Sequence, residues 1–380
     1  MGVLRLLLAV AVVFAHAGTI AGQGWMPGNL AVEAFFVISG FYMQMVLEAK
    51  YTPERLGRGF VWRFYAARYL RLLPVYLLVA AASWNAALLV TGGDPLATWD
   101  RLARLPDAGT GGSLLLGFLG ATNLTMFFQD MAMFLGVHDG RVAFFTDFRA
   151  SEIPVWRALA VPPAWSLGVE LSFYLLAPFL LRRSTLLLAG IALCAIGAKL
   201  AFLKLTGLGD PWTYRFFPFE LGWFLAGSLA YRARQRLAVD PRGRLRPVVV
   251  AGFYVLVIAV VAGWRAFGLS EHLVPPAIAL LLPTLAALTG TTRWDRWLGE
   301  LSYPAYILHW LVMSQLMISL GWQPHEGWRL PVATLTLTLA GSVLLLAAET
   351  RWIEPFRQRF SAAPRRGVAG ACLSGRGAPN

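Results

Sequence analysis

Long apolar stretches separated by short polar breaks run through the whole 380-residue chain. A helix needs about 20 residues to cross the hydrocarbon core of a bilayer, and each stretch approaches that length. The stretches cover residues 3–22, 30–48, 69–91, 113–135, 164–181, 184–206, 213–231, 247–268, 273–290, 298–320 and 330–352. Strands of a membrane barrel would be about 10 residues long with strict alternation, a pattern that the chain lacks. We therefore predict an all-α fold, a polytopic transmembrane helical bundle.

The composition supports this class and excludes others. Hydrophobic residues make up 57% of the chain and charged residues only 14%, whereas about 25% charged residues are typical of a soluble domain. This balance excludes an intrinsically disordered chain, and two cysteines exclude a disulfide-stabilised scaffold. No internal repeat is visible. We predict one membrane-embedded domain over residues 1–355 and a cytoplasmic, disordered basic tail over 356–380.

The distribution of arginine predicts the topology. The 33 basic and 20 acidic residues give a net charge of +13, which in a soluble protein would suggest nucleic acid binding. In this chain the basic residues are nearly all arginine and gather between apolar stretches, as in the cytoplasmic loops of membrane proteins. The clusters lie at Arg55–Arg71, Arg182–Arg183, Arg232–Arg246, Arg293 with Arg296, and from Arg351 onward.

One apolar stretch breaks the alternation. Three stretches lie between Arg71 and Arg182, although an even number of crossings is needed to return to the cytoplasm. The stretch 113–135 contains three polar residues, Asn123, Gln129 and Asp130. We therefore predict that it is re-entrant or interfacial and buried against protein. This leaves about ten spanning helices in an integral inner-membrane protein with both termini in the cytoplasm.

The first apolar stretch contains two ionisable residues, Arg5 and His16, and such residues are costly at bilayer depth. They are 11 positions apart, so on a helix they share one face and are separated along the axis by about 16 Å. We predict Arg5 at the cytoplasmic edge and His16 in the outer half. Arg5 could otherwise be an interfacial anchor, and His16 could form an interhelical hydrogen bond. Residues 1–24 also resemble a cleavable signal peptide, a competing interpretation.

Two carboxylates are predicted at a depth similar to that of His16. Glu33 and Glu170 both lie near the outer ends of their stretches. A histidine with one or two carboxylates in a pocket of low dielectric is a general acid/base arrangement, because the carboxylate orients the imidazole and stabilises the imidazolium. We predict His16, Glu33 and Glu170 as catalytic candidates. The alternative is a buried pair with a structural role.

Three arginines precede the third apolar stretch. Arg63, Arg68 and Arg71 alternate with aromatic residues in a predicted amphipathic lead-in helix, and the spacing of Arg68 and Arg71 places them on one face. Guanidinium groups bind phosphates bidentately, which favours a phosphate site at the cytoplasmic entrance. The alternative is a topology signal in contact with anionic lipid head groups.

Other polar residues inside predicted spans have simpler explanations. His309 lies near the middle of the stretch 298–320, where it could be a hydrogen-bonded core histidine. Arg215 and Glu220 enter another span from outside, where they could form a buried ion pair. No Cys/His cluster has zinc spacing, and no Walker loop or dinucleotide fingerprint occurs. A Gly-x-Ser-x-Gly elbow is missing too. We predict no metal site.

Several of these residues fall in short motifs that extend over about residues 1–350. They are Arg5 with His16, VEAFFVISGF at Val32–Phe41, RYLRLLP at Arg68–Pro74, WSLGVELSFY at Trp165–Tyr174 and SYPAYILH at Ser302–His309. In sequence and in order, these motifs resemble those of the acyltransferase 3 family of integral-membrane O-acyltransferases.

The resemblance implies an enzyme that moves an acyl group, usually acetyl, from cytoplasmic acyl-CoA to a hydroxyl group of a cell-surface glycan, glycolipid or related acceptor. It implies that His16 is the catalytic histidine and that Arg5 is its motif partner. With Arg5, three arginines become candidates for binding the coenzyme A phosphates: Arg63, Arg68 and Arg71. We expect no acyl relay through an appended serine domain within these 380 residues.

Further residues match motif positions without an assigned role. These are Trp165, Glu170, Tyr303 and His309. The family often has Gly-Val-Asp where this chain has Ala31-Val32-Glu33, so Glu33 keeps the carboxylate but lengthens its reach. Two other functions stay open: a transporter or flippase that uses the buried ionisable groups as a relay, and a non-catalytic membrane scaffold. Partners of the predicted enzyme are acyl-CoA, the hydroxyl acceptor and the bilayer, without nucleic acid.

Overall fold

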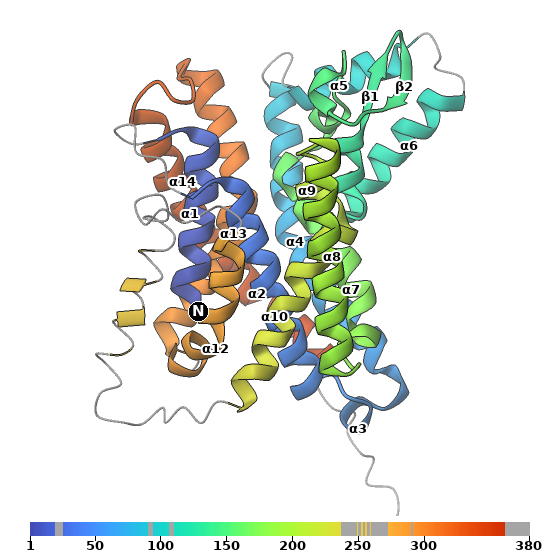
Figure 1. Ribbon diagram of the computed structural model, residues 1–380. Helices are drawn as coiled ribbons and strands as arrows, with labels where there is room; N and C mark the ends of the chain where they lie inside the picture. Colours follow the sequence, from blue (N-terminus) through green and yellow to red (C-terminus); the bar gives the residue numbers. More distant parts are fainter. Residues whose placement is uncertain are drawn as a thin grey trace, which may run out of the picture.

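The computed structural model describes residues 1–19, 26–89, 94–105, 110–236, 273–289 and 292–361, and isolated positions between 249 and 259. These residues form a mostly helical bundle (Figure 1). Its longer helices are α1 (Gly2–Ala17), α2 (Gly28–Ala49), α4 (Phe60–Leu89), α6 (Thr110–Thr125), α7 (Trp165–Leu180), α8 (Thr185–Thr206), α10 (Phe217–Arg236), α12 (Val274–Thr289), α13 (Arg293–Leu320) and α14 (Arg329–Ala348). Shorter helices are α3 (Pro53–Leu56), α5 (Asp94–Ala103), α9 (Trp212–Arg215) and α15 (Glu354–Ser361).

The apolar stretches agree closely with the observed helices. The stretches 164–181 and 184–206, for example, correspond to α7 and α8 almost to the residue. Helix α4 begins well before its apolar stretch, because the predicted amphipathic lead-in is continuous with the span. The stretch 247–268 lies almost entirely outside the described residues.

The stretch 113–135 contains a helix that stops early. Helix α6 has 16 residues, which cover about 24 Å, less than the roughly 30 Å of the hydrocarbon core. A 3-10 turn follows, and then an antiparallel hairpin of β1 (Leu135–His138) and β2 (Arg141–Phe144) with Leu135 opposite Phe144. This hairpin departs from the all-α prediction. That the segment does not cross completely stays a prediction, which the length of α6 favours.

Four helical segments in the described part of the chain are long and apolar enough to cross a membrane: Gly28–Ala49, Pro53–Leu89, Thr185–Thr206 and Arg329–Phe360. Two apolar helices, α1 and α12, are shorter. The segments support a membrane protein, since about 20 apolar residues suffice to span the core. The number of ten spans and the cytoplasmic termini stay predictions.

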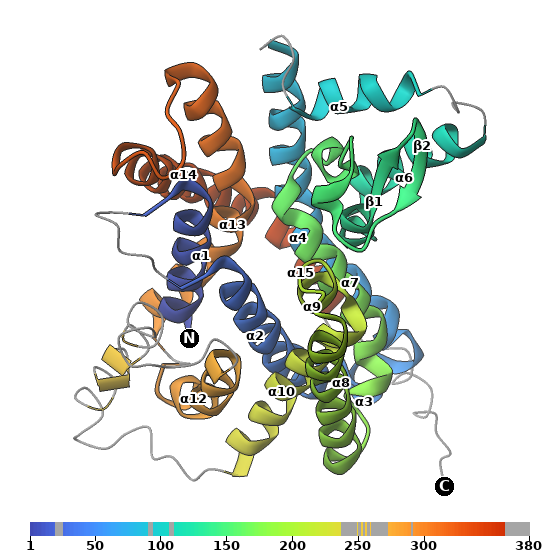
Figure 2. The ribbon, with the colours of Figure 1, turned by 45° about the horizontal axis from the view of Figure 1, so that its top comes forward.

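Helices α1 and α13 lie side by side and run in the same direction (Figures 1 and 2). The carboxylate of Asp295 accepts hydrogen bonds from the backbone N–H groups of Gly2 at 2.9 Å and Val3 at 3.0 Å, so it caps the start of α1. Further along, Arg5 lies beside Gly299. This parallel register brings the histidines of the two helices to the same height.

Helices α2 and α10 approach each other closely because glycines stand at their crossing. A Cβ atom on Gly40 would lie 1.8 Å from the carbonyl oxygen of Phe224, and one on Gly227 would lie 1.7 Å from that of Val37. Small residues at such crossings let backbones pack tightly, which is a main source of association between helices in membranes.

We expect Gly40→Ala to destabilise the bundle by ~3 kcal/mol or more, because backbone carbonyl atoms cannot move aside as a side chain can. Gly197→Ala in α8 is the matched control, since no described atom beyond its own stretch of helix lies within 4 Å of the position its Cβ would take. Thermal unfolding of the purified protein in detergent would test the pair. Equal melting temperatures for the two variants would contradict this account of the crossing.

The predicted disordered tail is helical where it begins. Residues 354–361 form α15, which follows a π-helical turn over Glu349–Ile353 and packs against α4. Phe360 of this helix is partly buried and packs against the hydrophobic core, which accounts for the helix where disorder was predicted for 356–361. Residues 362–380 lie outside the described residues.

Candidate active site

His16 of α1 and His309 of α13 contact each other directly. His16 Nδ1 lies 3.1 Å from His309 Nε2, and the two rings stack with centroids 5.1 Å apart and planes inclined by 19°. His309 is fully buried and His16 is half-buried. The pair follows from the parallel packing of the two helices and joins two motifs that are far apart in the sequence.

The hydrogen bonds indicate which nitrogen of each ring carries the proton. His309 Nδ1 lies 2.6 Å from the carbonyl oxygen of Tyr306, which can only accept, so Nδ1 carries the hydrogen. In a neutral ring the other nitrogen is an acceptor, and His309 Nε2 therefore accepts from the Nδ1–H of His16. The His16 ring also has the backbone carbonyl of Val12, one turn earlier, as a hydrogen-bond partner. With Nδ1 carrying the hydrogen, Nε2 keeps its lone pair and can act as a base.

Aromatic side chains surround the histidine pair. The edge of Trp310 meets the His16 ring at a centroid distance of 5.4 Å. The Tyr306 hydroxyl lies 2.8 Å from Ser166 Oγ and donates to the carbonyl oxygen of Pro163 at 3.0 Å. Tyr306 therefore holds His309 through its backbone and anchors α13 to the start of α7 through its side chain.

Arg215 lies near the same end of the site but pairs differently from the prediction. Its Nε donates to Asp210 Oδ1 at 2.6 Å and its Nη2 to Asp210 Oδ2 at 3.2 Å. The guanidinium also stacks over Trp165, 4.3 Å from the ring centroid, and lies within electrostatic range of His16. The ion pair expected between Arg215 and Glu220 is wrong. The Arg215 guanidinium pairs with Asp210, and Glu220 pairs with Lys199.

Glu33 and Glu220 share one buried cation. Lys199 Nζ donates to Glu33 Oε1 at 2.6 Å and to Glu220 Oε1 at 2.7 Å, and it lies 5.6 Å from the Trp223 ring centroid. The three charged residues come from α2, α8 and α10 and tie these helices together. Sequence reasoning missed Lys199, although a lysine inside an apolar stretch was itself a signal.

Glu170 belongs to a different hydrogen-bonded group. Its Oε1 accepts from Ser39 Oγ at 2.6 Å and from the Tyr174 hydroxyl, and its charge lies within range of Arg5. The predicted acid/base residues thus have separate partners: His16 bonds to His309, Glu33 to Lys199, and Glu170 to Ser39 and Tyr174. Similar depth did not imply contact, because helix rotation decides which side chains meet.

Three of the four predicted phosphate-binding arginines gather toward the start of α1. Arg5 has Tyr42, Arg71 and Glu170 as electrostatic neighbours, and Arg68 has Arg71. The Nε atom of Arg68 is buried and has no hydrogen-bond partner among the described residues. A buried, unpartnered guanidinium N–H group is costly, so it points to a ligand that bears an acceptor oxygen.

The remaining candidates are an arginine earlier on α4 and a tyrosine of α13. Arg63 lies five residues before Arg68, about 140° away around the helix, and is half-buried. The Tyr303 hydroxyl donates to the carbonyl oxygen of Leu72 at 2.5 Å, which joins α13 to α4 beside Arg71. Tyr303 thus holds together the helices that carry the arginines and the histidine pair.

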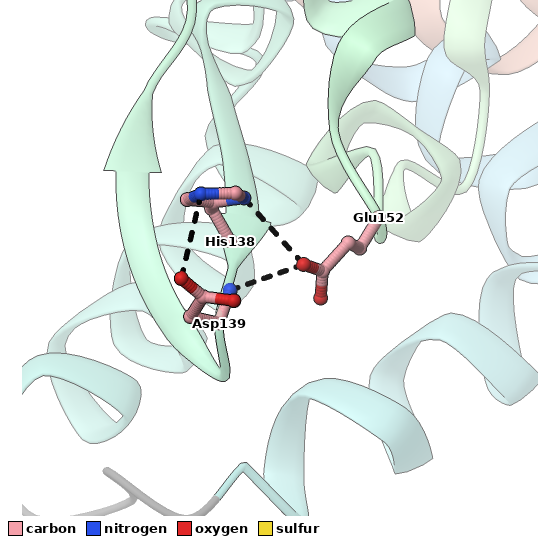
Figure 3. A group of neighbouring side chains, drawn as sticks. All are labelled: His138, Asp139 and Glu152. Carbon is pink, nitrogen blue, oxygen red and sulfur yellow. Dashed lines mark hydrogen bonds and ion pairs between the residues drawn. The ribbon is translucent and has the colours of Figure 1, made fainter.

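A second histidine cluster lies on the β1–β2 hairpin, as Figure 3 shows. His138 Nδ1 lies 3.5 Å from Glu152 Oε1, and His138 Nε2 lies 3.5 Å from Asp139 Oδ2. Glu152 also accepts from the backbone N–H of Asp139 at 3.1 Å. All three side chains are exposed. We interpret their mutual contacts as stabilising the hairpin turn.

Comparison with known proteins agrees with the motifs. A family model for an acyltransferase domain, that of the acyltransferase 3 family, matches residues 1–347. Nodulation protein 10 of Rhizobium leguminosarum bv. viciae is 25% identical over 374 residues, 90% of each chain. An uncharacterized protein of Aquifex aeolicus (strain VF5) is 27% identical over 168 residues, 42% of this chain and 73% of that protein. No solved structure matches the chain. The chain belongs to the acyltransferase 3 family, and it is a membrane acyltransferase.

Proposed function

We propose that this acyltransferase moves an acyl group, acetyl in the simplest case, from cytoplasmic acyl-CoA to a hydroxyl group of a cell-surface glycan, glycolipid or related acceptor. The observation that carries the proposal is the bond between His16 and His309, which leaves His16 Nε2 free to act as a base. The arginine group near the start of α1 supports a donor that bears phosphates.

The chemistry follows from the free lone pair. His16 Nε2 accepts the proton of the acceptor hydroxyl group, and the oxygen of that hydroxyl group attacks the thioester carbonyl carbon. The tetrahedral intermediate collapses by breaking the carbon–sulfur bond, and the leaving thiolate takes the proton from His16. The products are the ester and coenzyme A thiol, and His16 returns to its neutral form.

His309 supports this cycle without touching the proton that moves. Its Nε2 accepts from His16 Nδ1–H, which holds the reactive tautomer and the ring orientation. The bond persists when His16 becomes an imidazolium, because that form donates from both nitrogens. In this arrangement a second imidazole takes the orienting part that the sequence suggested for Glu33 or Glu170.

In this proposal the two ends of α1 have different roles: donor binding at the end with Arg5 and proton transfer at the end with His16. Arg5 and His16 are about 16 Å apart along one helix face. This distance is of the right order for an extended pantetheine arm whose phosphates bind among the arginines and whose thioester reaches His16. The acceptor then approaches from the opposite side, where Trp310 contacts the His16 ring and Arg215, stacked over Trp165, lies within electrostatic range of it.

A direct attack of His16 Nε2 on the thioester is the alternative chemistry, and it would give an acyl-imidazole intermediate with ping-pong kinetics. Rapid mixing of the enzyme with labelled acetyl-CoA, without acceptor, separates the two. A stoichiometric burst of coenzyme A thiol identifies the acyl-enzyme, whereas direct transfer produces thiol only when the acceptor is added.

Mass spectrometry of surface glycans and lipids tests the overall function. We expect an ester present in cells that carry the wild-type gene to disappear on deletion and to return on complementation. The mass difference would identify both the acyl group and the acceptor. An unchanged ester profile, together with no binding of acetyl-CoA to the purified protein, would overturn the proposal.

Donor binding offers a direct prediction at the arginine group. We expect Arg68→Ala to weaken acetyl-CoA binding about tenfold or more, because a charge-assisted hydrogen bond to phosphate is lost. Isothermal titration in detergent would measure this. Arg58→Ala is the matched control, since Arg58 is exposed and lies in the 3-10 turn Gly57–Gly59 that precedes α4. Equal affinities for the two variants would show that Arg68 does not bind the donor.

A further inference from the structure

Helix α15 brings a fourth arginine to the arginine group. The family match ends at residue 347, so α15 lies beyond the matched region. The π-helical turn over Glu349–Ile353 precedes it, and such turns often occur at functional sites. Because α15 packs against α4, Arg357 comes within electrostatic range of Arg68. Figure 2 shows α15 beside α4.

The guanidinium of Arg357 is held at one end and unpartnered at the other. Its Nη2 forms an ion pair with Glu354 one turn earlier on the same helix, and the side chain is only 16% exposed. Its Nη1 is buried and has no hydrogen-bond partner among the described residues. The Glu354 carboxylate thus orients the group and leaves one N–H side available.

Two arginines from packed helices therefore present buried N–H groups without a partner among the described residues, and the two side chains lie within electrostatic range of each other: Nε of Arg68 and Nη1 of Arg357. Like charges repel in a partly buried site, an effect that Glu354 and Glu349 beside Arg357 offset in part. Unsatisfied donors add a desolvation cost. An oxyanion bound between the two arginines would satisfy the donors and lower the remaining repulsion. Phosphate fits best, since its tetrahedral oxygens accept from guanidinium groups in more than one direction.

We propose that Arg357 and Arg68 bind one phosphate group of the acyl donor between α15 and α4, so that the C-terminal helix completes the donor site. This inference rests on the proposed use of acyl-CoA. The same chemistry would suit the phosphate of an anionic lipid, and the donor is favoured because Arg68 belongs to the group that includes Arg71 and Arg5 at the start of α1.

The test compares Arg357→Gln with Arg359→Gln in phosphatidylcholine nanodiscs. Arg359 is the matched control, because it lies on the same helix, is exposed and stacks over Phe356. We expect Arg357→Gln to weaken acetyl-CoA binding about tenfold and Arg359→Gln to leave it unchanged. Binding of acetyl-pantetheine, which keeps the thioester arm but lacks every phosphate, should not respond to either substitution. Thermal unfolding reports whether both variants are folded.

Three outcomes would overturn the assignment, and each has a different meaning. If wild-type protein binds acetyl-CoA and both variants match it, the Arg357 site is wrong while the proposed function stands. If Arg357→Gln lowers acetyl-pantetheine binding equally, the residue acts on overall structure rather than on phosphate. If wild-type protein binds no acetyl-CoA, but Arg357→Gln reduces its retention of added phosphatidylglycerol, the phosphate belongs to a lipid and the proposed donor fails.

Discussion

Replacing His16 with alanine is expected to lower the rate of acyl transfer by on the order of 10³-fold, within the range that a positioned general base contributes. The variant loses His16 Nε2, the nitrogen that we infer to be the free acceptor of the histidine pair within the described structure. Transfer of labelled acetyl from acetyl-CoA to the acceptor, measured in membranes with matched protein levels, would show the loss. Binding of acetyl-CoA should persist, because the phosphate contacts proposed for the donor lie at the other end of α1.

His138→Ala provides the matched control for His16→Ala. His138 is an exposed histidine on the hairpin, where it braces the turn with Asp139 and Glu152 (Figure 3). We expect this variant to retain activity close to that of the wild type. Full activity in His16→Ala would rule out both the general-base and the acyl-imidazole mechanism. Loss of acetyl-CoA binding together with activity would instead indicate that the substitution disturbs the bundle.

The second large effect is expected at His309. Replacement with leucine removes the acceptor for His16 Nδ1–H, so the His16 ring is free to rotate and to exchange tautomers. We expect kcat to fall by roughly 10²-fold, within the range of general acid/base effects, while the KM for acyl-CoA changes little. Steady-state kinetics of the purified enzyme in nanodiscs would measure both constants.

His309→Gln separates orientation from packing. The glutamine amide oxygen can accept from His16 Nδ1–H, so this variant should recover a substantial part of the activity that His309→Leu loses. A purely structural role for this fully buried residue would lower the activity of both variants alike, in parallel with their melting temperatures. That result would contradict the orienting role proposed for His309.

The helical elements were largely predictable because bilayer solvation acts on each segment separately. A segment must be apolar over about 20 residues to cross, and the backbone must satisfy its own hydrogen bonds within the helix. The observed bounds of α7 and α8 therefore follow closely from composition alone. The exceptions are elements without that constraint: the β1–β2 hairpin and helix α15, which form through contacts with other parts of the chain.

The candidate site was predictable in its parts but not in its pairings. An ionisable residue in an apolar stretch is visible in the sequence, so Arg5, His16 and His309 could all be singled out. Helix rotation and register are set by packing, however, and here the capping of α1 by Asp295 places α1 alongside α13. That register joins His16 to His309, whereas similar depth alone had suggested carboxylate partners.

The amino-acid order alone established the membrane class, the helix positions, the arginine clusters and the motifs of an acyltransferase, because each depends on local composition or short spacing. The folded arrangement was needed to pair His16 with His309, to assign Lys199 to Glu33 and Glu220, and to bring Arg357 to Arg68. The reason is physical: hydrophobicity is a property of each segment, while hydrogen bonds and charge contacts between helices depend on how close-packed backbones orient their side chains.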